Sequence, residues 1–275
     1  ASTTANVGKT SNKGVEFTLN AIPVETRDFS WTSSFNMGWQ KDRIDELANG
    51  KNDMKGNKWF IGESLGVHYD YAVDGLWQDT PEDLAEIEKW NKNGYNFQPG
   101  MVRPHDVDGN YIMDDDDLVI LGNKRPTWTA GWTNIFNYKG IELSFQMYGR
   151  FDYMVHQPQY LFGYGNLGNQ IDYWTPDNTG AEYQKPILTS VQSGTADTYA
   201  SQLGYKKANF IRMRNISVGY NVPSKCLSKV ALNSIKVYGQ VINPFDIYQS
   251  VNGFDLDTGS SYYNRSWVIG LELGF

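Results

Sequence analysis

The residues of this chain best suited to chemistry are acids that lie close together between positions 106 and 117. Oxygen-bearing groups recur there at alternating positions, as in an EF-hand-like calcium loop, where a turning backbone surrounds a hard cation. The candidate ligands are Asp106, Asp108, Asn110, Ile112 through its carbonyl, and Asp116 or Asp117. The spacing therefore indicates a candidate structural calcium site.

This acidic loop departs from the calcium-binding pattern in two places. Tyr111 stands where the pattern has a glycine, and Ile112 comes one residue early. Either Asp116 or Asp117 could therefore supply the closing carboxylate. The alternative is a solvated acidic loop that holds no ion.

A second group of acids follows Thr80 in the sequence TPEDLAEIEKW. Thr80 suits a helix N-cap, Pro81 suits the first helical position, and acids favour the positive end of a helix. A short exposed helix is the prediction. Two carboxylates at the right separation could hydrolyse a glycosidic bond, but acids are common in loops, and we expect no catalytic residues.

Aromatic residues lie in the segments between the regions with strand-like patterns. They could stack on sugar rings or contact a protein that covers these loops, and the alternative is that they form the core of the loops. The candidates for substrate or lid contact are Trp77, Trp90, Tyr160, Tyr164 and Trp174. Residues 174–178 (WTPDN) are themselves predicted to form a proline-centred turn.

Composition excludes several other kinds of site. The net charge of −7 and the pI near 5.0 argue against nucleic acid as a partner. A single cysteine, Cys226, excludes an internal disulfide. The three histidines are far apart in sequence, which disfavours a histidine zinc site. The roles of Arg212 and Arg214 stay open at this stage.

The elements that position these residues are predicted to be strands. Aromatic residues make up 15% of the chain, there are 27 glycines, and the mean hydropathy is −0.53. This composition is typical of many strands joined by polar loops. The sequence has no apolar run long enough for a transmembrane helix, but strands of about 9 to 11 residues also cross a membrane.

Strict alternation of apolar and polar residues predicts about six to eight strands. The segments that alternate are 15–21, 29–39, 128–138, 141–151, 208–222, 235–241 and 267–275. Aromatic residues stand near the ends of the apolar faces, as at the two lipid interfaces of a barrel, whereas the opposite faces are polar. The pairs are Trp31 with Trp39, Trp128 with Tyr138, and Trp267 with Phe275.

The links between these strands differ in length. Short links at 22–28, 139–140 and 223–234 alternate with longer ones at 40–127, 152–205 and 246–263. Bacterial membrane barrels have short periplasmic turns and long extracellular loops. This parity places Phe275 in the periplasm. Residues 62–78 are also strand-like and could add a pair of strands within the first long link.

Several stretches, taken together and in order, resemble the SusC/RagA family of TonB-linked outer-membrane proteins. The resemblance covers nearly the whole chain. The stretches are NVGKTSNKGVEFTLNA, GVHYDYAVDGLWQ, PGMVRPHDVDGNYIMDDDDLVILGNKRPTWTAGW, NYKGIELSFQMYGR, DYWTPDNTGAEYQKP, NFIRMRNISVGYNVP, VYGQVINPF and WVIGLELGF.

This resemblance implies an antiparallel transmembrane β-barrel of 22 strands, of which residues 1–275 are the C-terminal part. The plug and the segment that contacts TonB are absent from these residues. The implied activity is the import of oligosaccharides or peptides, energised through TonB and working with a SusD-like surface lipoprotein. No cofactor is required. The aromatic C-terminus resembles a signal for barrel assembly.

A membrane barrel with only these strands would also be physically unstable, so further strands are expected beside them. Six to eight strands cannot close a barrel with a plugged lumen, and open edges in lipid are prohibitive. The expected partners are the remaining strands, the plug, the TonB complex, the lipoprotein lid and outer-membrane lipid. One alternative is a secreted all-β carbohydrate-binding module or glycoside hydrolase. Another is a purely structural outer-membrane barrel.

Overall fold

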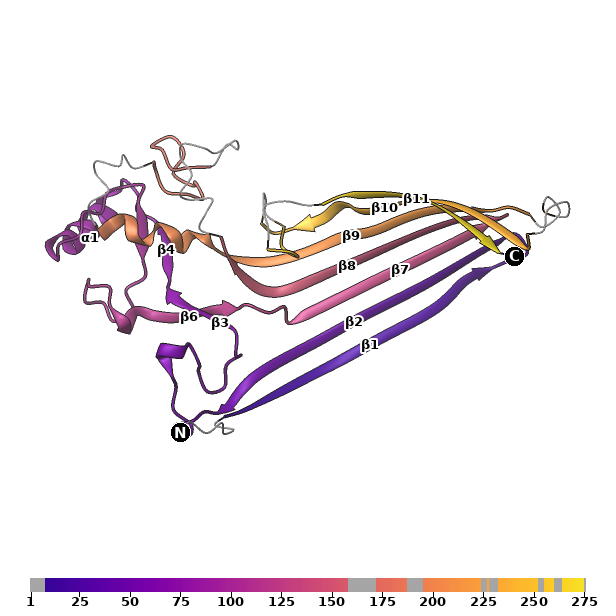
Figure 1. Ribbon diagram of the computed structural model, residues 1–275. Coiled ribbons are helices and arrows are strands. Elements are labelled where there is room, and N and C mark those ends of the chain that lie inside the picture. The colour runs from indigo at the N-terminus through magenta and orange to yellow at the C-terminus, as the bar shows by residue number, and fades with distance from the viewer. Residues whose placement is uncertain are drawn as a thin grey trace, which may run out of the picture.

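The structure is a computed structural model, and it describes residues 8–157, 172–186, 195–223, 227, 232–251, 255–259 and 264–274. These residues form a long curved sheet, here called the wall, and a group of loops at one end of it, here called the cap (Figure 1). Among them no helix is long and apolar enough to cross a membrane.

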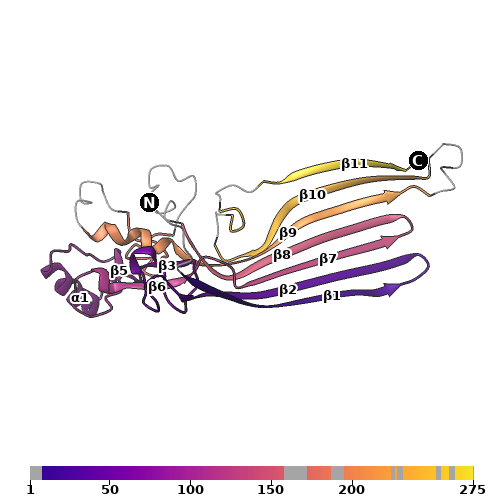
Figure 2. The ribbon, with the colours of Figure 1, turned by 60° about the horizontal axis from the view of Figure 1, so that its bottom comes forward.

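The wall is a single antiparallel sheet whose strands lie side by side in chain order (Figure 2). Its strands are β1 (Lys9–Glu25), β2 (Phe29–Glu46), β7 (Trp128–Tyr138), β8 (Ile141–His156), β9 (Tyr205–Asn221), β10 (Ser234–Gln249) and β11 (Ser266–Gly274). Each of the segments predicted from alternation forms one of these strands, except that Val222 lies just past the end of β9 and Phe275 lies outside the described residues. The number of strands agrees with the prediction of six to eight.

Register keeps the alternation in phase between neighbouring strands over most of the wall, with local shifts in β1, β8, β9 and β10. Phe17 lies opposite Met37, and Phe136 lies opposite Leu143. One side, the apolar face, therefore collects the large hydrophobic residues, and the other side is the polar face. Exposed members of the apolar face are Val15, Phe17, Leu19, Trp128, Trp132, Leu143, Val218, Val237, Ile269 and Leu271.

The two ends of the wall differ. The β1–β2 and β7–β8 turns lie at the same end as the C-terminal end of β11, and the cap lies at the opposite end (Figure 1). The β7–β8 turn has only Lys139 and Gly140 between the strands, with φ of 46° and 90°. A two-residue hairpin turn needs such left-handed conformations, which glycine adopts readily.

The cap contains the remaining elements, formed by the links 47–127 and 157–204. They are η1 (Lys55–Asn57), β3 (Val67–Tyr71), β4 (Val73–Leu76), α1 (Pro81–Lys92), β5 (Val102–Pro104), η2 (Asp115–Asp117), β6 (Leu118–Asn123) and η4 (Thr195–Gly204). β3 pairs with β6, and β4 pairs with β5. The strand-like residues 62–78 thus form small sheets in the cap and do not join the wall.

Helix α1 begins where the sequence indicates. The Thr80 side chain accepts a hydrogen bond from the Asp83 backbone N–H at 3.3 Å, and Pro81 is the first helical residue. The expectation that the helix is exposed is wrong for one side of it, because Ile87 and Trp90 are buried. These two side chains enter the main core of the cap.

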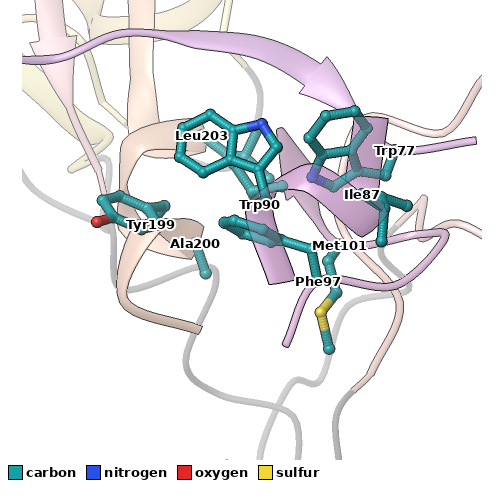
Figure 3. Close-up of a cluster of buried hydrophobic side chains, with 9 residues drawn as sticks. Trp77, Ile87, Trp90, Phe97, Met101, Tyr199, Ala200 and Leu203 are labelled. Carbon is teal, nitrogen blue, oxygen red and sulfur yellow. The ribbon is translucent and has the colours of Figure 1, made fainter. Parts of the chain in front are cut away.

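This core joins the two long links (Figure 3). Trp90 lies edge-on to Phe97, with ring centres 5.6 Å apart. Tyr199 and Leu203, from η4, complete the core from the far side of the chain. The two links therefore fold as one unit. The full set of buried residues is Trp77, Ile87, Trp90, Phe97, Met101, Val102, Tyr199, Ala200 and Leu203.

Candidate functional site

The acidic loop of the cap brings three carboxylates together. Oxygens of Asp106, Asp108 and Asp117 lie within 4.8 Å of one another. Hydrogen bonds shape the loop. Asp106 accepts from the backbone N–H of Gly109 at 2.7 Å, and the buried Asp117 accepts from the backbone N–H of Val107 at 2.8 Å. This arrangement has the hard oxygen groups that calcium prefers.

The two candidates for the closing carboxylate differ in their positions. Asp117 is in the group, whereas Asp116 is exposed outside it. Asn110 remains in the loop, where its side-chain oxygen accepts a hydrogen bond from the backbone N–H of Ile112 at 2.6 Å. Partial desolvation raises the pKa of Asp108, and the charges of Asp106 and Asp117 raise it further. Negative charge is thus concentrated here.

Tyr111 explains how the loop forms without the usual glycine. Its φ is +63°, the left-handed conformation that glycine supplies in calcium loops. The strain of this backbone is offset by packing, since the Tyr111 ring lies edge-on to Trp90 at 5.8 Å. Asn93 also donates a hydrogen bond to the Tyr111 carbonyl at 3.0 Å. The loop is therefore fastened to the main core.

Three of the predicted contact aromatics lie inside the cap. Trp77, Trp90 and Trp174 are 1%, 3% and 6% exposed. The Trp174 indole N–H donates to the Gln78 side chain at 2.9 Å. These three tryptophans therefore form the core of the loops, which was the alternative interpretation. A buried ring offers no face to a sugar or to a lid. Tyr160 and Tyr164 lie outside the described residues.

The predicted proline-centred turn is present at 174–178. The backbone N–H of Asn178 donates to the Thr175 carbonyl at 2.9 Å, and the Asn178 side chain donates to the Tyr173 carbonyl at 3.2 Å. The turn seats Trp174 over Gly100, where an added Cβ would come within 2.4 Å of the indole ring. Its function in this structure is packing.

The acids of helix α1 have structural partners. Asp83 accepts from the Gln78 backbone N–H at 2.7 Å and lies 3.3 Å from the Arg103 guanidinium. Glu86 and Glu88 pair with lysines one helical turn later. These contacts cap and support the helix, as expected of acids near its positive end.

Sequence reasoning left Arg212 without a role, and the structure gives it one. Arg212 lies on the polar face and is 2% exposed. Its Nε donates to Asp246 at 2.6 Å, and its Nη2 donates to Asp255 at 2.8 Å. A register shift between Met213 and Asn215 turns Arg212 to the polar face, and its partners are 34 and 43 residues away in the sequence.

The same network continues to Asp257. Its carboxylate accepts from the Tyr148 hydroxyl and pairs with Arg150 at 2.8 Å. Burial works to raise the pKa of Asp255, but hydrogen bonds from Arg212 and Thr258 outweigh it and hold that pKa below its usual range. Residues 255–259 are therefore held to the wall by the buried pair of Asp255 with Arg212 and by the partly exposed pair of Asp257 with Arg150.

The two long links are also tied together by polar contacts. Asp70 of β3 accepts from the Tyr205 hydroxyl at 2.7 Å and from the Gln202 side chain at 3.3 Å. His156 stacks on Tyr205, with ring centres 4.0 Å apart. Together with the main core, these contacts fix the cap on the end of β8 and β9.

Aromatic pairs mark both ends of the apolar face. Trp39 and Trp128 lie opposite each other at the cap end, with ring centres 6.3 Å apart. Trp31 stacks on Phe136 near the turn end, at 5.7 Å. The apolar face between these pairs is the surface that a bilayer core would contact.

Known proteins resemble this chain in both sequence and fold. No protein-family model matches it. It is 25% identical over 304 residues to the TonB-dependent receptor P3 of Formosa agariphila, a match that covers 98% of the chain and 29% of the receptor. It is 27% identical over 297 residues to the TonB-dependent receptor SusC of Bacteroides thetaiotaomicron, covering 100% of the chain and 27% of SusC. The resemblance to the SusC/RagA family is confirmed.

Solved structures match the fold of this SusC/RagA-like chain. A structure of the RagAB peptide transporter gives a TM-score of 0.71 at 21% identity, covering 98% of the chain and 30% of the solved one. The RagAB peptide importer in its open-open state gives 0.70 at 20% identity. The wall thus has the fold of part of a transporter barrel. The matched relatives are receptors and transporters, not enzymes, and the chain spans less than a third of their length.

Proposed function

We propose that this chain forms part of the barrel of an outer-membrane importer that is energised through TonB. The observation that carries the proposal is the wall, whose apolar face exposes large hydrophobic residues along its length. Its opposite face holds a buried network of arginines and aspartates. Lipid on one side and a lumen on the other account for both faces.

In this proposal residues 1–275 are the C-terminal part of the barrel. Both outer edges of the wall, on β1 and β11, lack a neighbouring strand among the described residues. A bilayer does not tolerate open edges, so further strands of the complete protein pair there. The plug and the TonB-contacting segment belong to other parts of that protein. The cap is extracellular, and the end of β11 is periplasmic.

We propose a SusD-like surface lipoprotein as the lid over the cap. Substrates are oligosaccharides or peptides. The likeness to SusC and to a peptide transporter structure supports this class of cargo and partner. The cap supplies a folded platform at the outer end of the wall, and its acidic loop holds a structural calcium ion.

A secreted all-β module or glycoside hydrolase is the alternative. Such a protein would expose the apolar face to water, which soluble proteins avoid over areas this large. The carboxylates of helix α1 are engaged with their own helix and with neighbouring cations. No observation among the described residues favours this alternative.

Membrane fractionation of the complete protein tests the proposal. The protein should float with outer membranes, require detergent for extraction, and co-purify with a surface lipoprotein. Uptake of labelled oligosaccharide or peptide should stop when TonB is deleted. A protein that stays soluble and monomeric without detergent would contradict the membrane location. Uptake that is indifferent to TonB would support a purely structural barrel.

A further inference from the structure

Two lysines face each other at the cap end of the wall. Lys13 of β1 lies directly opposite Lys41 of β2, and both are exposed. Like charges at directly opposite positions destabilise an antiparallel pair. Among the described residues no carboxylate pairs with either ammonium group. The neighbouring Arg43 differs, because Asp45 neutralises it at 2.7 Å.

Register places the lysines on the apolar face, immediately beyond its aromatic end. The next pair along the two strands on the same side is Val15 with Trp39. Trp39 in turn packs on Trp128. Aromatic residues gather at the level of lipid headgroups, and the lysines therefore lie at or just above that level.

A hollow interrupts the apolar face on the membrane side of this aromatic pair. Its volume is about 200 Å³ and its lining is apolar. It forms where two small residues, Ala130 of β7 and Gly149 of β8, lie opposite each other. The rings of Trp132 and Phe151 border it. A hollow in a surface that contacts hydrocarbon suits a flexible acyl chain.

We propose that Lys13 and Lys41 bind the phosphate of an outer-leaflet lipid and that the hollow takes one of its acyl chains. Along the strands, Lys41 is two residues beyond the aromatic pair, and Ala130 is two residues before it. That separation is roughly 13 Å at about 3.3 Å per residue, which one lipid molecule spans. A phosphate between the lysines replaces their repulsion with charge-assisted hydrogen bonds.

The hollow is the reason to assign a lipid and not free phosphate. Two exposed lysines without an arginine fork hold a free anion weakly in water. An acyl chain adds the burial of apolar surface beside them. The inference rests on the proposed outer-membrane location, because only that location brings lipid to this face.

Native mass spectrometry of the complete protein in detergent tests this inference. The probes are dioleoyl phosphatidic acid and dioleoyl phosphatidylcholine, offered in equal amounts. The wild type should retain phosphatidic acid with a preference of roughly tenfold or more, since basic residues near a membrane surface each attract anionic lipid. The K13Q/K41Q variant should lose this preference. K51Q/K55Q removes two exposed lysines of the cap and should keep it.

Two further experiments test separately the role of the hollow and the assignment of a lipid instead of free phosphate. A130L fills the hollow and should weaken the retention of both lipids while the preference for phosphatidic acid remains. An excess of inorganic phosphate should displace little lipid, and full displacement would overturn the assignment to a lipid.

Failure of this inference is distinguishable from failure of the proposed function. If K13Q/K41Q keeps the wild-type preference in a protein that floats with outer membranes, the lipid site is wrong and the importer proposal stands. A protein that is soluble without membranes would overturn both.

Discussion

Arg212 shows what a single residue contributes to the wall. Its guanidinium group forms ion pairs with Asp246, with Asp255 and, at 3.8 Å, with Asp257. Local alternation in the sequence could not place Arg212 on the polar face, because a register shift between Met213 and Asn215 changes the side to which the following residues point. It could not find the partners, because two of them belong to an irregular segment whose path depends on the folded wall.

Replacing Arg212 with alanine should release residues 255–259 from the wall. Removing one partner of a buried ionic group leaves the others uncompensated, at a cost of about 3 to 5 kcal/mol. Hydrogen exchange in residues 246–259 should rise strongly. The matched control is R214A, because the Arg214 guanidinium lies over the Tyr148 ring at 5.4 Å and forms no ion pair with another described residue. Equal exchange in both variants would contradict the role of Arg212.

The acidic loop is expected to bind a calcium-like cation. Terbium, a luminescent substitute for calcium, should bind the loop and be displaced by calcium. D108N should weaken binding by about tenfold or more, because ligand charge tunes the affinity of calcium loops. D115N, which removes a neighbouring exposed acid, should have little effect. Terbium luminescence that is identical in both variants would place the ion elsewhere.

Elements of the wall and of the cap differ in how well the sequence predicts them. β7 occupies the predicted residues 128–138, because its alternation and its two-residue turn are local signals. β1 and β2 extend well beyond their predicted ends, since the hairpin continues after the strict alternation stops. The pairing of β3 with β6 joins segments about 50 residues apart, and no local pattern indicates it.

The W90A substitution should unfold the cap and leave the wall intact. Truncating a buried tryptophan costs about 3 to 5 kcal/mol, and Trp90 contacts both Phe97 and the acidic loop. Protease should then cut within residues 47–127 of the folded barrel. L84A on the same helix is the control, because Leu84 is exposed. A cap that resists protease in W90A would mean that this core is dispensable.

The whole molecule is organised by its two faces. Apolar residues of the wall point to one side for the length of β1 to β11, while the cap has its own core. Alternation predicts this separation of faces. It does not predict the cap core, because that core combines two links separated by the β7–β8 hairpin.

Neighbouring residues of β1 allow the two faces to be tested. Phe17 lies on the apolar face and Thr18 on the polar face. F17K should block barrel assembly, because a lysine in the bilayer midplane costs about 2 to 4 kcal/mol. T18K should assemble normally. Heat-modifiable migration of the complete protein in gels reports assembly, and equal migration of both variants would contradict the assignment of the faces.

The shared core of the cap also sets an order of events during biosynthesis. Residues 77–102 emerge from the ribosome before residues 199–203, with which they pack. Until residues 199–203 are present, Trp77 and Trp90 in the first half of the cap lack part of the core that buries them. It needs protection from aggregation until β8 and β9 bring the second half into place.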